Sequence, residues 1–245
     1  MRKKSIRFFF FKSNMLFIVD KEEKVIIGWC AKSGCSHIKR IYWFFRTGNP
    51  NHRIHTTRDR NDLPPDEEMK DYRTILIVRN PYKRLISGFL DKYRKDGGQF
   101  RNRWKNDKIT FSDFVEHLVN KDWKTIDFHH FAWQTSEHFN EYKLKMSKDL
   151  RVYDLNNIDY KYLESLYDNK RIPHQLLDFR GGHDRKIQKE DYYDYVYNKD
   201  MSEYYDYNVD IRLFFNEELK RKVDKFFEDD IYFLEKHNIS HKLVG

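Results

Sequence analysis

The sequence has little cysteine and no apolar run long enough to cross a membrane. Only Cys30 and Cys35 occur among 245 residues, so a disulfide framework is excluded and we expect a reducing compartment. The aromatic run at 8–11 is interrupted by Lys12 and is far shorter than the roughly 20 residues of a membrane helix. No clear cleavage site for a signal peptide follows it. We therefore expect a cytoplasmic protein without a transmembrane segment.

Internal repeats and low-complexity linkers are also absent from the sequence. The length suits one large domain or two small ones, with enough chain for a sizeable core. Because nothing in the composition marks a boundary, we expect a single domain over residues 1–245. We expect residues 1–13 to form a peripheral N-terminal extension of it.

The charge is unbalanced towards positive, with 47 Lys and Arg against 39 Asp and Glu and a net charge of +8. This balance favours anionic partners such as phosphate ligands, acidic polymers or membrane surfaces, although a solvated basic surface explains it equally well. No basic block is long enough to be a nucleic-acid arm. The tyrosine-rich segments near the C-terminus are interleaved with acids that repel phosphate backbones, so nucleic acid is not an expected partner.

Strand-like and helix-like segments alternate along the chain. Apolar runs predict strands over 15–20, 24–30, 74–79 and 150–155. Amphipathic spacing predicts helices over 36–45, 82–94, 110–120 and 157–167, with a mainly helical C-terminal part. The alternation predicts an α/β fold with a central, mainly parallel sheet flanked by helices.

The segment AKSGCSH at 31–37 has the features of an anion-binding loop. It lies between a strand and a helix, Gly34 allows close approach, and the first N–H groups of the helix are unpaired. Lys32 supplies a mobile positive charge and Ser36 a hydroxyl. The residues that we expect to bind an anion here are Ala31, Lys32, Ser33, Gly34, Cys35, Ser36 and His37. A glycine turn with an exposed lysine is common, so the loop alone leaves a purely structural role open.

A second anion site is predicted in VRNPYKRLISGFLDKY at 78–93. Arg79 falls at the carboxyl end of a buried strand, where α/β sheets place ligand-binding residues. Arg79 and Ser87 could together hold a phosphate by charge and hydroxyl donation. For Arg84 we expect a local ion pair with Asp91 instead. Two anion sites at neighbouring strand ends imply a ligand with two separated phosphate-like groups.

These two segments resemble the donor-binding motifs of the carbohydrate sulfotransferases, especially the chondroitin/dermatan 4-O-sulfotransferase branch. KVIIGWCAKSGCSHIKR is similar to that family's 5′-phosphosulfate loop, and VRNPYKRLISGFLDKY to its 3′-phosphate motif. Looser matches follow in TFSDFVEHL, IDFHHFAWQ, YDLNNIDY and GGHDRK, so the resemblance runs from about Met15 to the C-terminus. Ala31 replaces the loop proline that is usual in the family, and the extra cysteines of the animal enzymes are missing.

The resemblance implies a P-loop-like sulfotransferase fold and 3′-phosphoadenosine 5′-phosphosulfate (PAPS) as donor. A sulfuryl group would pass in line to a hydroxyl of a glycan acceptor, acidic glycans included, with adenosine 3′,5′-bisphosphate as product and no metal. Lys32 would stabilise charge on the leaving phosphate, and loop N–H groups with Ser36 would hold the 5′-phosphate. Arg79 and Ser87 would hold the 3′-phosphate. Arg185 would also contact the cofactor.

The acceptor hydroxyl needs a general base, and histidine suits neutral pH. His129 fits best, because it matches the Asp-x-His segment of the family. His55 comes second, since other glycan sulfotransferases carry a catalytic histidine between the two motifs. His52, His130 and His183 remain further histidines of the same regions.

Two other functions compete with sulfuryl transfer. A P-loop phosphotransferase such as a nucleotide kinase would share the fold class, but no Gly-Lys-Ser/Thr order occurs at the loop. A non-catalytic protein that binds an anionic polymer would use the basic and aromatic residues without chemistry. Both alternatives stay open from the sequence alone.

Overall fold

Three parallel strands and one antiparallel strand make the central sheet. The computed structural model describes residues 15–50, 62–93, 98, 100–104, 108–135, 141–177, 196–200 and 210–243. The strands are β1 (Leu16–Asp20), β2 (Val25–Trp29), β3 (Arg73–Val78) and β4 (Asp149–Asp154), in spatial order β1-β2-β3-β4. β1 pairs antiparallel with β2, and the β2–β3 and β3–β4 pairs are parallel. The carboxyl ends of β2, β3 and β4 therefore meet at one edge.

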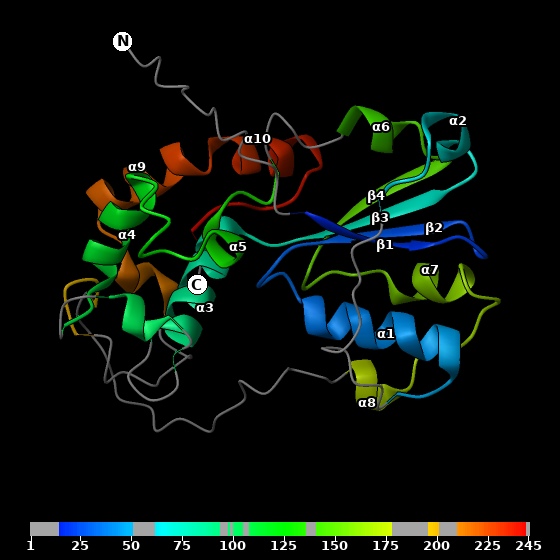
Figure 1. The fold of residues 1–245 in the computed structure, drawn as a ribbon, viewed down its shortest axis with the longest axis horizontal. Helices are drawn as coiled ribbons and strands as arrows, with labels where there is room; N and C mark the ends of the chain where they lie inside the picture. Colours follow the sequence, from blue (N-terminus) through cyan, green and yellow to red (C-terminus); the bar gives the residue numbers. More distant parts are fainter. Residues whose placement is uncertain are drawn as a thin grey trace, which may run out of the picture.

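Helices follow the strands and cover the sheet (Figure 1). The α-helices are α1 (Cys35–Thr47), α2 (Asp66–Met69), α3 (Pro81–Lys92), α4 (Phe111–Val119), α5 (Phe128–Phe131), α6 (Glu141–Lys145), α7 (Tyr160–Ser165), α8 (His174–Leu177), α9 (Glu217–Phe226) and α10 (Glu228–Lys236). Two short 3₁₀ helices, η2 (Arg101–Arg103) and η5 (Ile211–Phe214), lie before α4 and α9. None of the helices within the described ranges is both long and apolar enough to cross a membrane.

The predicted α/β class and all four predicted strands are confirmed. The longer helices also match, and Thr110 caps α4 as its spacing suggests, accepting from Asp113 N–H at 3.0 Å. The helix predicted over 157–167 is shorter because Asp159 caps it and starts it at Tyr160. The four-residue helices α2, α5 and α8 and the five-residue α6 were not predicted, since such short elements carry no periodic signal.

Alternate side chains of β3 are buried on opposite faces of the sheet. Ile75 and Ile77 point to one face, where they pack with α1, α7 and α8, and Leu76 and Val78 point to the other, where α2, α6 and α10 contribute. This period of two is what a parallel sheet covered on both sides requires.

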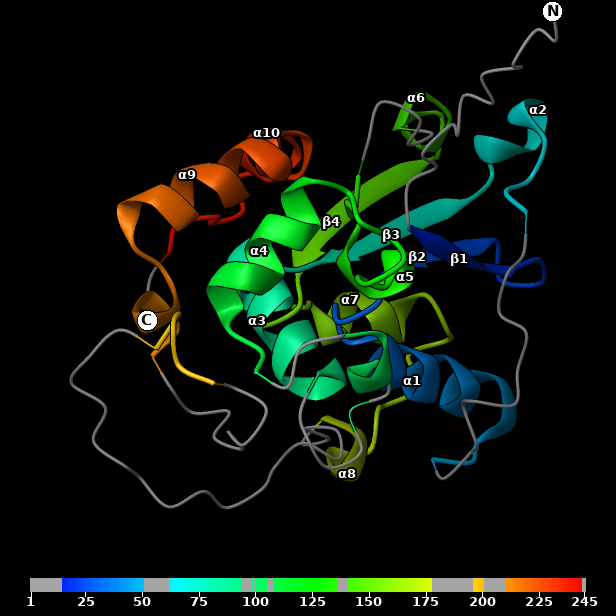
Figure 2. The same cartoon turned by 60° about the vertical axis from the view of Figure 1, so that its left-hand side comes forward.

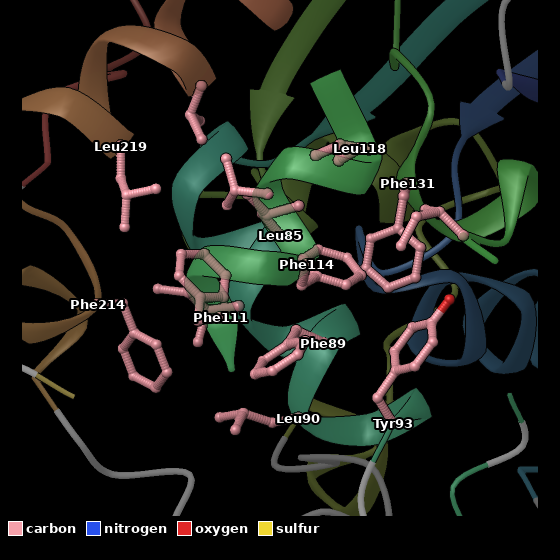
Figure 3. Close-up of a cluster of buried hydrophobic side chains, with 14 of the residues drawn as sticks. Leu85, Phe89, Leu90, Tyr93, Phe111, Phe114, Leu118, Phe131, Phe214 and Leu219 are labelled. Carbon is pink, nitrogen blue, oxygen red and sulfur yellow. The ribbon is translucent and has the colours of Figure 1, made fainter. Parts of the chain in front are cut away.

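A third cluster lies beside the sheet, where α3, α4, α5, η5 and α9 pack together (Figure 2). Its centre is aromatic: the rings of Phe89, Phe114 and Phe131 come from three helices, with neighbouring ring centroids 4.9 Å apart (Figure 3). Gly88 lets α5 approach α3 closely, because a Cβ there would lie 2.6 Å from the Phe131 ring. The cluster thus holds α5 directly against α3.

One buried polar network joins these layers. Arg84 on α3 is only 1% exposed, and its Nε donates to the Ala31 carbonyl at 3.0 Å. Its nearby guanidinium also offsets the charge of Asp230 on α10, whose pKa is raised by burial and lowered by Arg84. The expected ion pair of Arg84 with Asp91 is wrong, because Arg84 points inward to a distant carbonyl while Asp91 meets Lys32.

Arg84→Met should destabilise the protein in a pH-dependent way. It removes the nearby cation that offsets the buried Asp230 carboxylate, and it leaves the Ala31 carbonyl without its donor, which typically costs about 1–3 kcal/mol for a buried group. When folding raises the pKa of a carboxyl group, the contribution of that group to the free energy of unfolding falls as the pH rises above its unfolded-state pKa. Urea unfolding should therefore show a larger loss at pH 7.5 than at pH 5.

Two further variants control this experiment. Lys83→Met, on the adjacent and partly exposed position of α3, should change the unfolding free energy by less than about 1 kcal/mol. Adding Asp230→Asn to Arg84→Met should restore part of the loss at pH 7.5. An equal loss at both pH values would show that Asp230 is not the cause.

Candidate active site

The loop between β2 and α1 is a tight turn with two residues in the left-handed region. Lys32 and Gly34 have φ values of 67° and 74°, and Ser33 N–H donates to the Cys30 carbonyl at 3.2 Å. At Lys32 this conformation costs about 1–2 kcal/mol, and such strain concentrates at functional sites. At Gly34 a Cβ would also lie 2.2 Å from Leu155 Cδ1. The loop is therefore pressed against the residue that follows β4.

The N-terminus of α1 presents unpaired backbone donors. The helix has no side-chain cap and no acidic residue in its first turn. Its first bond runs from Ile38 N–H to the Gly34 carbonyl at 3.0 Å, so the N–H groups of Cys35, Ser36 and His37 have no intrahelical acceptor. With the dipole of a 13-residue helix behind them, these donors can hold a phosphate or sulfate group.

Two arginines bind the carbonyl groups of the same loop. Arg79, directly after β3, donates from Nη1 to the Lys32 carbonyl at 2.9 Å, and Arg84 binds the Ala31 carbonyl. Burial lowers the pKa of Arg79, and the nearby Asp154 opposes that effect. Carbonyl oxygens that would repel an anion are thus occupied by cations. The structure brings the two predicted anion-binding segments into direct contact.

Lys32 lies in a small cluster of charges with two residues from the end of α3. Its Nζ is 3.2 Å from Asp91 Oδ2, and the Lys92 Nζ is 3.0 Å from the same oxygen. The Lys32 side chain is 11% exposed, and burial lowers its pKa while Asp91 opposes the shift. Ser87 lies one turn earlier on α3 and is partly exposed. An anion near Lys32 would therefore compete with Asp91 for the ammonium group.

A histidine and an aspartate form a hydrogen-bonded pair on the short helix α5. Asp127 caps the helix by accepting from His130 N–H at 3.0 Å, and its Oδ2 is 2.6 Å from His130 Nδ1. Burial lowers the pKa of His130, Asp127 opposes this, and nearby Lys92 and Lys32 lower it further. Burial acts to raise the pKa of Asp127, but its contacts with His130 bring it below the ordinary value.

This pair leaves His130 Nε2 as the ring nitrogen not bound to Asp127. A carboxylate on Nδ1 fixes the tautomer, so that Nε2 is a proton acceptor. His129, the predicted base, lies beside it with ring centroids 4.9 Å apart. The nearby charges of Lys92 and Lys32 act to lower the pKa of His130. Asp127 could have been recognised from sequence as a helix cap, but its second bond, to the ring of His130, could not.

Gln134 is a residue that sequence reasoning missed altogether. It is 1% exposed and bonds both to Ser33 in the loop and to the backbone of Arg79. No motif or periodicity marks it, because its partners lie 101 and 55 residues away.

The remaining predicted residues differ in where they lie. Ser33 points inward, donating from Oγ to Gln134 Oε1 at 2.9 Å. His37 Nε2 lies 2.8 Å from the Tyr160 hydroxyl, and burial lowers the pKa of His37. His55 and Arg185 lie outside the described residues, as do His52 and His183.

The candidate site combines the N–H groups of a helix N-terminus, an ion-paired lysine and a hydrogen-bonded imidazole. Such a site can hold a charged group, neutralise charge that develops on it, and accept a proton from a nearby hydroxyl. In the described ranges no group of three or more His, Cys, Asp or Glu side chains could hold a metal ion.

Comparison with known proteins identifies the family of the chain. A model of the sulfotransferase family matches residues 15–236, a span that includes the loop, Arg79 and the Asp127–His130 pair. No curated protein and no solved structure gave a match. Because the family match covers nearly the whole chain and every part of the site described above, the protein belongs to the sulfotransferase family, whose members transfer a sulfuryl group.

Proposed function

We propose that this protein transfers a sulfuryl group from PAPS to a hydroxyl group of a carbohydrate. The observation that carries the proposal is the bond from Arg79 to the Lys32 carbonyl, which joins two anion-binding segments into one site. PAPS carries phosphate groups at both ends of its ribose, so it matches a site with two adjoining anion-binding segments. A P-loop-like sulfotransferase fold is part of this proposal, as is adenosine 3′,5′-bisphosphate as product.

The loop and α1 would hold the 5′-phosphosulfate. The N–H groups of Gly34, Cys35, Ser36 and His37 would donate hydrogen bonds to it, with the Ser36 hydroxyl beside them. Ala31 and Ser33 would shape the loop from inside, since the Ala31 carbonyl accepts from Arg84 and the Ser33 hydroxyl faces Gln134.

The 3′-phosphate would lie against Arg79 and Ser87. Nη1 of Arg79 holds the Lys32 carbonyl, while its Nε and Nη2 have no partner in the described part of the chain. These two nitrogens could donate to a phosphate in the planar geometry that arginine favours. Arg185 remains a further proposed contact to the cofactor.

Lys32 would leave Asp91 when the donor binds and place its ammonium group near the bridging oxygen. Sulfuryl transfer resembles phosphoryl transfer, in which catalysis comes mainly from positioning and from stabilising charge on the leaving group. The burial that lowers the pKa of Lys32 also strengthens its interaction with a developing negative charge. No metal is needed for this step.

His130 would accept the proton of the acceptor hydroxyl, with Asp127 holding its ring. The hydrogen bond from its ring to the Asp127 carboxylate supports His130 for this role. His129 and His55 remain alternative bases. Arg103, whose Nη1 lies 3.4 Å from Asp127 Oδ1, adds positive charge beside the pair and suits an acceptor glycan that carries acidic groups.

Adenosine 3′,5′-bisphosphate should stabilise the protein against heat, whereas ATP with Mg²⁺ and oligonucleotides should not. At a concentration 100 times its Kd, a ligand that binds only the folded state adds about 2.7 kcal/mol of stability. Differential scanning fluorimetry with all three ligands measures this, and Arg79→Ala should reduce the response. A clear response to ATP with Mg²⁺ alone would point to the phosphotransferase and overturn the proposal.

Lys32→Ala should lower kcat for sulfuryl transfer by about 10²–10³-fold, the usual loss when one preorganised charge-stabilising donor is removed. Affinity for adenosine 3′,5′-bisphosphate should change much less, because loop N–H groups and Arg79 remain. Radiolabelled PAPS with a panel of glycans measures transfer, and exposed Lys70→Ala is the matched control. Near wild-type transfer by Lys32→Ala would exclude the assigned role.

His130→Ala should reduce kcat by about 10²–10⁴-fold, since general-base catalysis typically contributes that much. The base must be neutral, so wild-type activity should fall only at a pH below the ordinary histidine pKa of 6.5. The Asp127 carboxylate raises the pKa of His130. Asp127→Asn removes that effect and should move the acid limb of the pH–rate profile to still lower pH.

His117→Ala is the control for this prediction, because His117 forms a comparable pair with Asp122, at 2.9 Å, on α4. It should leave kcat unchanged. If His129→Ala abolishes transfer while His130→Ala does not, the base is His129 and the Asp127 contact is only a helix cap.

A further inference from the structure

The side chain of Gln134 lies buried between the two segments of the candidate site. Its Oε1 accepts from Ser33 Oγ and from Arg79 N–H, both at 2.9 Å. Its Nε2 donates to the Arg79 carbonyl at 2.8 Å. One amide group therefore contacts the loop that faces the 5′ end and the residue that faces the 3′ end.

The contact with Arg79 is a peptide-like pairing. Arg79 follows the last residue of β3, and the side-chain amide of Gln134 bonds both its N–H and its C=O, as a neighbouring strand would. This pairing fixes the backbone from which the Arg79 guanidinium extends. A small rotation of that backbone would displace the guanidinium by a much larger distance.

Gln134 is itself held from behind by α10. Its backbone N–H donates to Asp230 Oδ2 at 3.0 Å, and Thr135 donates to Asp230 Oδ1 from its N–H at 2.7 Å and its hydroxyl at 2.9 Å. Gln134 and Asp230 are each 1% exposed. A buried amide that is hydrogen-bonded on all sides is held in one position. It can therefore fix the positions of Ser33 and Arg79 relative to each other.

We propose that Gln134 is a positioning residue that fixes the spacing between the two phosphate sites and so couples them. The inference rests on the proposed function, because it assumes that one ligand occupies both sites. If the spacing between the two sites is already fixed, the second phosphate binds without any further ordering of its site. A bisphosphate therefore gains more affinity from this spacing than either monophosphate does. Coupling between sites of this kind is typically worth 5- to 150-fold in affinity.

The experiment compares three ligands by isothermal titration calorimetry: adenosine 3′,5′-bisphosphate, adenosine 5′-monophosphate and adenosine 3′-monophosphate. Gln134→Met keeps an unbranched side chain of similar length but removes every polar contact. It should weaken bisphosphate binding at least about tenfold and each monophosphate less than about threefold. Gln134→Glu keeps the acceptors for Ser33 and Arg79 N–H and should recover part of the bisphosphate affinity. Exposed Gln175→Met on α8 should change none of the three.

The outcomes separate the inference from the proposed function. If the wild-type protein does not bind the bisphosphate, the proposed function fails first. If it binds, but Gln134→Met weakens all three ligands equally or none of them, the coupling role is overturned and the proposed function stands. Should Gln134→Met fail to fold, Ser33→Ala decides instead. It removes the Ser33 contacts with Gln134 and Cys30 but leaves both bonds between Gln134 and Arg79, and it should show a selective loss for the bisphosphate in the same direction.

Discussion

The candidate site depends on two hydrogen bonds from arginine side chains to the carbonyl groups of one loop. Arg84 binds the Ala31 carbonyl and Arg79 binds the Lys32 carbonyl. Without these cations, two carbonyl dipoles would lie unpaired beside the N–H groups that face an anion. With them, the loop is held in a turn that keeps Lys32 in the left-handed region. The direction of Lys32 and the exposure of the α1 donors both follow from this constraint, because each depends on where the loop backbone lies.

Each buried cation of the site is offset by a carboxylate from a different element. Asp230 on α10 lies near enough to Arg84, and Asp154 at the end of β4 near enough to Arg79, for their charges to interact, whereas Asp91 on α3 forms an ion pair with Lys32. These interactions differ in kind. Asp230 is fixed by three hydrogen bonds of its own, whereas Asp91 is shared between Lys32 and Lys92. An incoming anion could therefore replace Asp91 at Lys32 more easily than it could replace Asp230 near Arg84. The structure thus holds the carboxylate near Arg84 by several hydrogen bonds, while the carboxylate at Lys32 is shared between two lysines.

The sequence correctly predicted the strands and the longer helices, which depend on neighbouring residues. It did not predict the side-chain contacts between segments that are distant in the chain. The strand over 74–79 and the helices after both motifs follow from apolar period, glycine and proline, which are local signals. Arg84 was placed wrongly because helical spacing shows that Arg84 and Asp91 share a face but not what packs on that face. Gln134 was missed for a similar reason, since its chemistry exists only once β3 and the loop are brought to it. Local pattern therefore predicted the loop and the strand end of the candidate site, and long-range packing determines the partner of each side chain within it.

The same distinction bears on the two adjacent histidines of α5. Successive helical residues point about 100° apart, so the rings of His129 and His130 leave α5 in different directions. Asp127 holds His130, because a capping carboxylate reaches the residue three positions ahead, and its oxygen bonds both the N–H and the ring of His130. The close contact of Phe131 with Gly88 then sets how near α5 lies to α3, and hence how near that ring lies to Lys92 and Lys32. The relative position of His130 and the two lysines therefore depends on how the aromatic cluster packs.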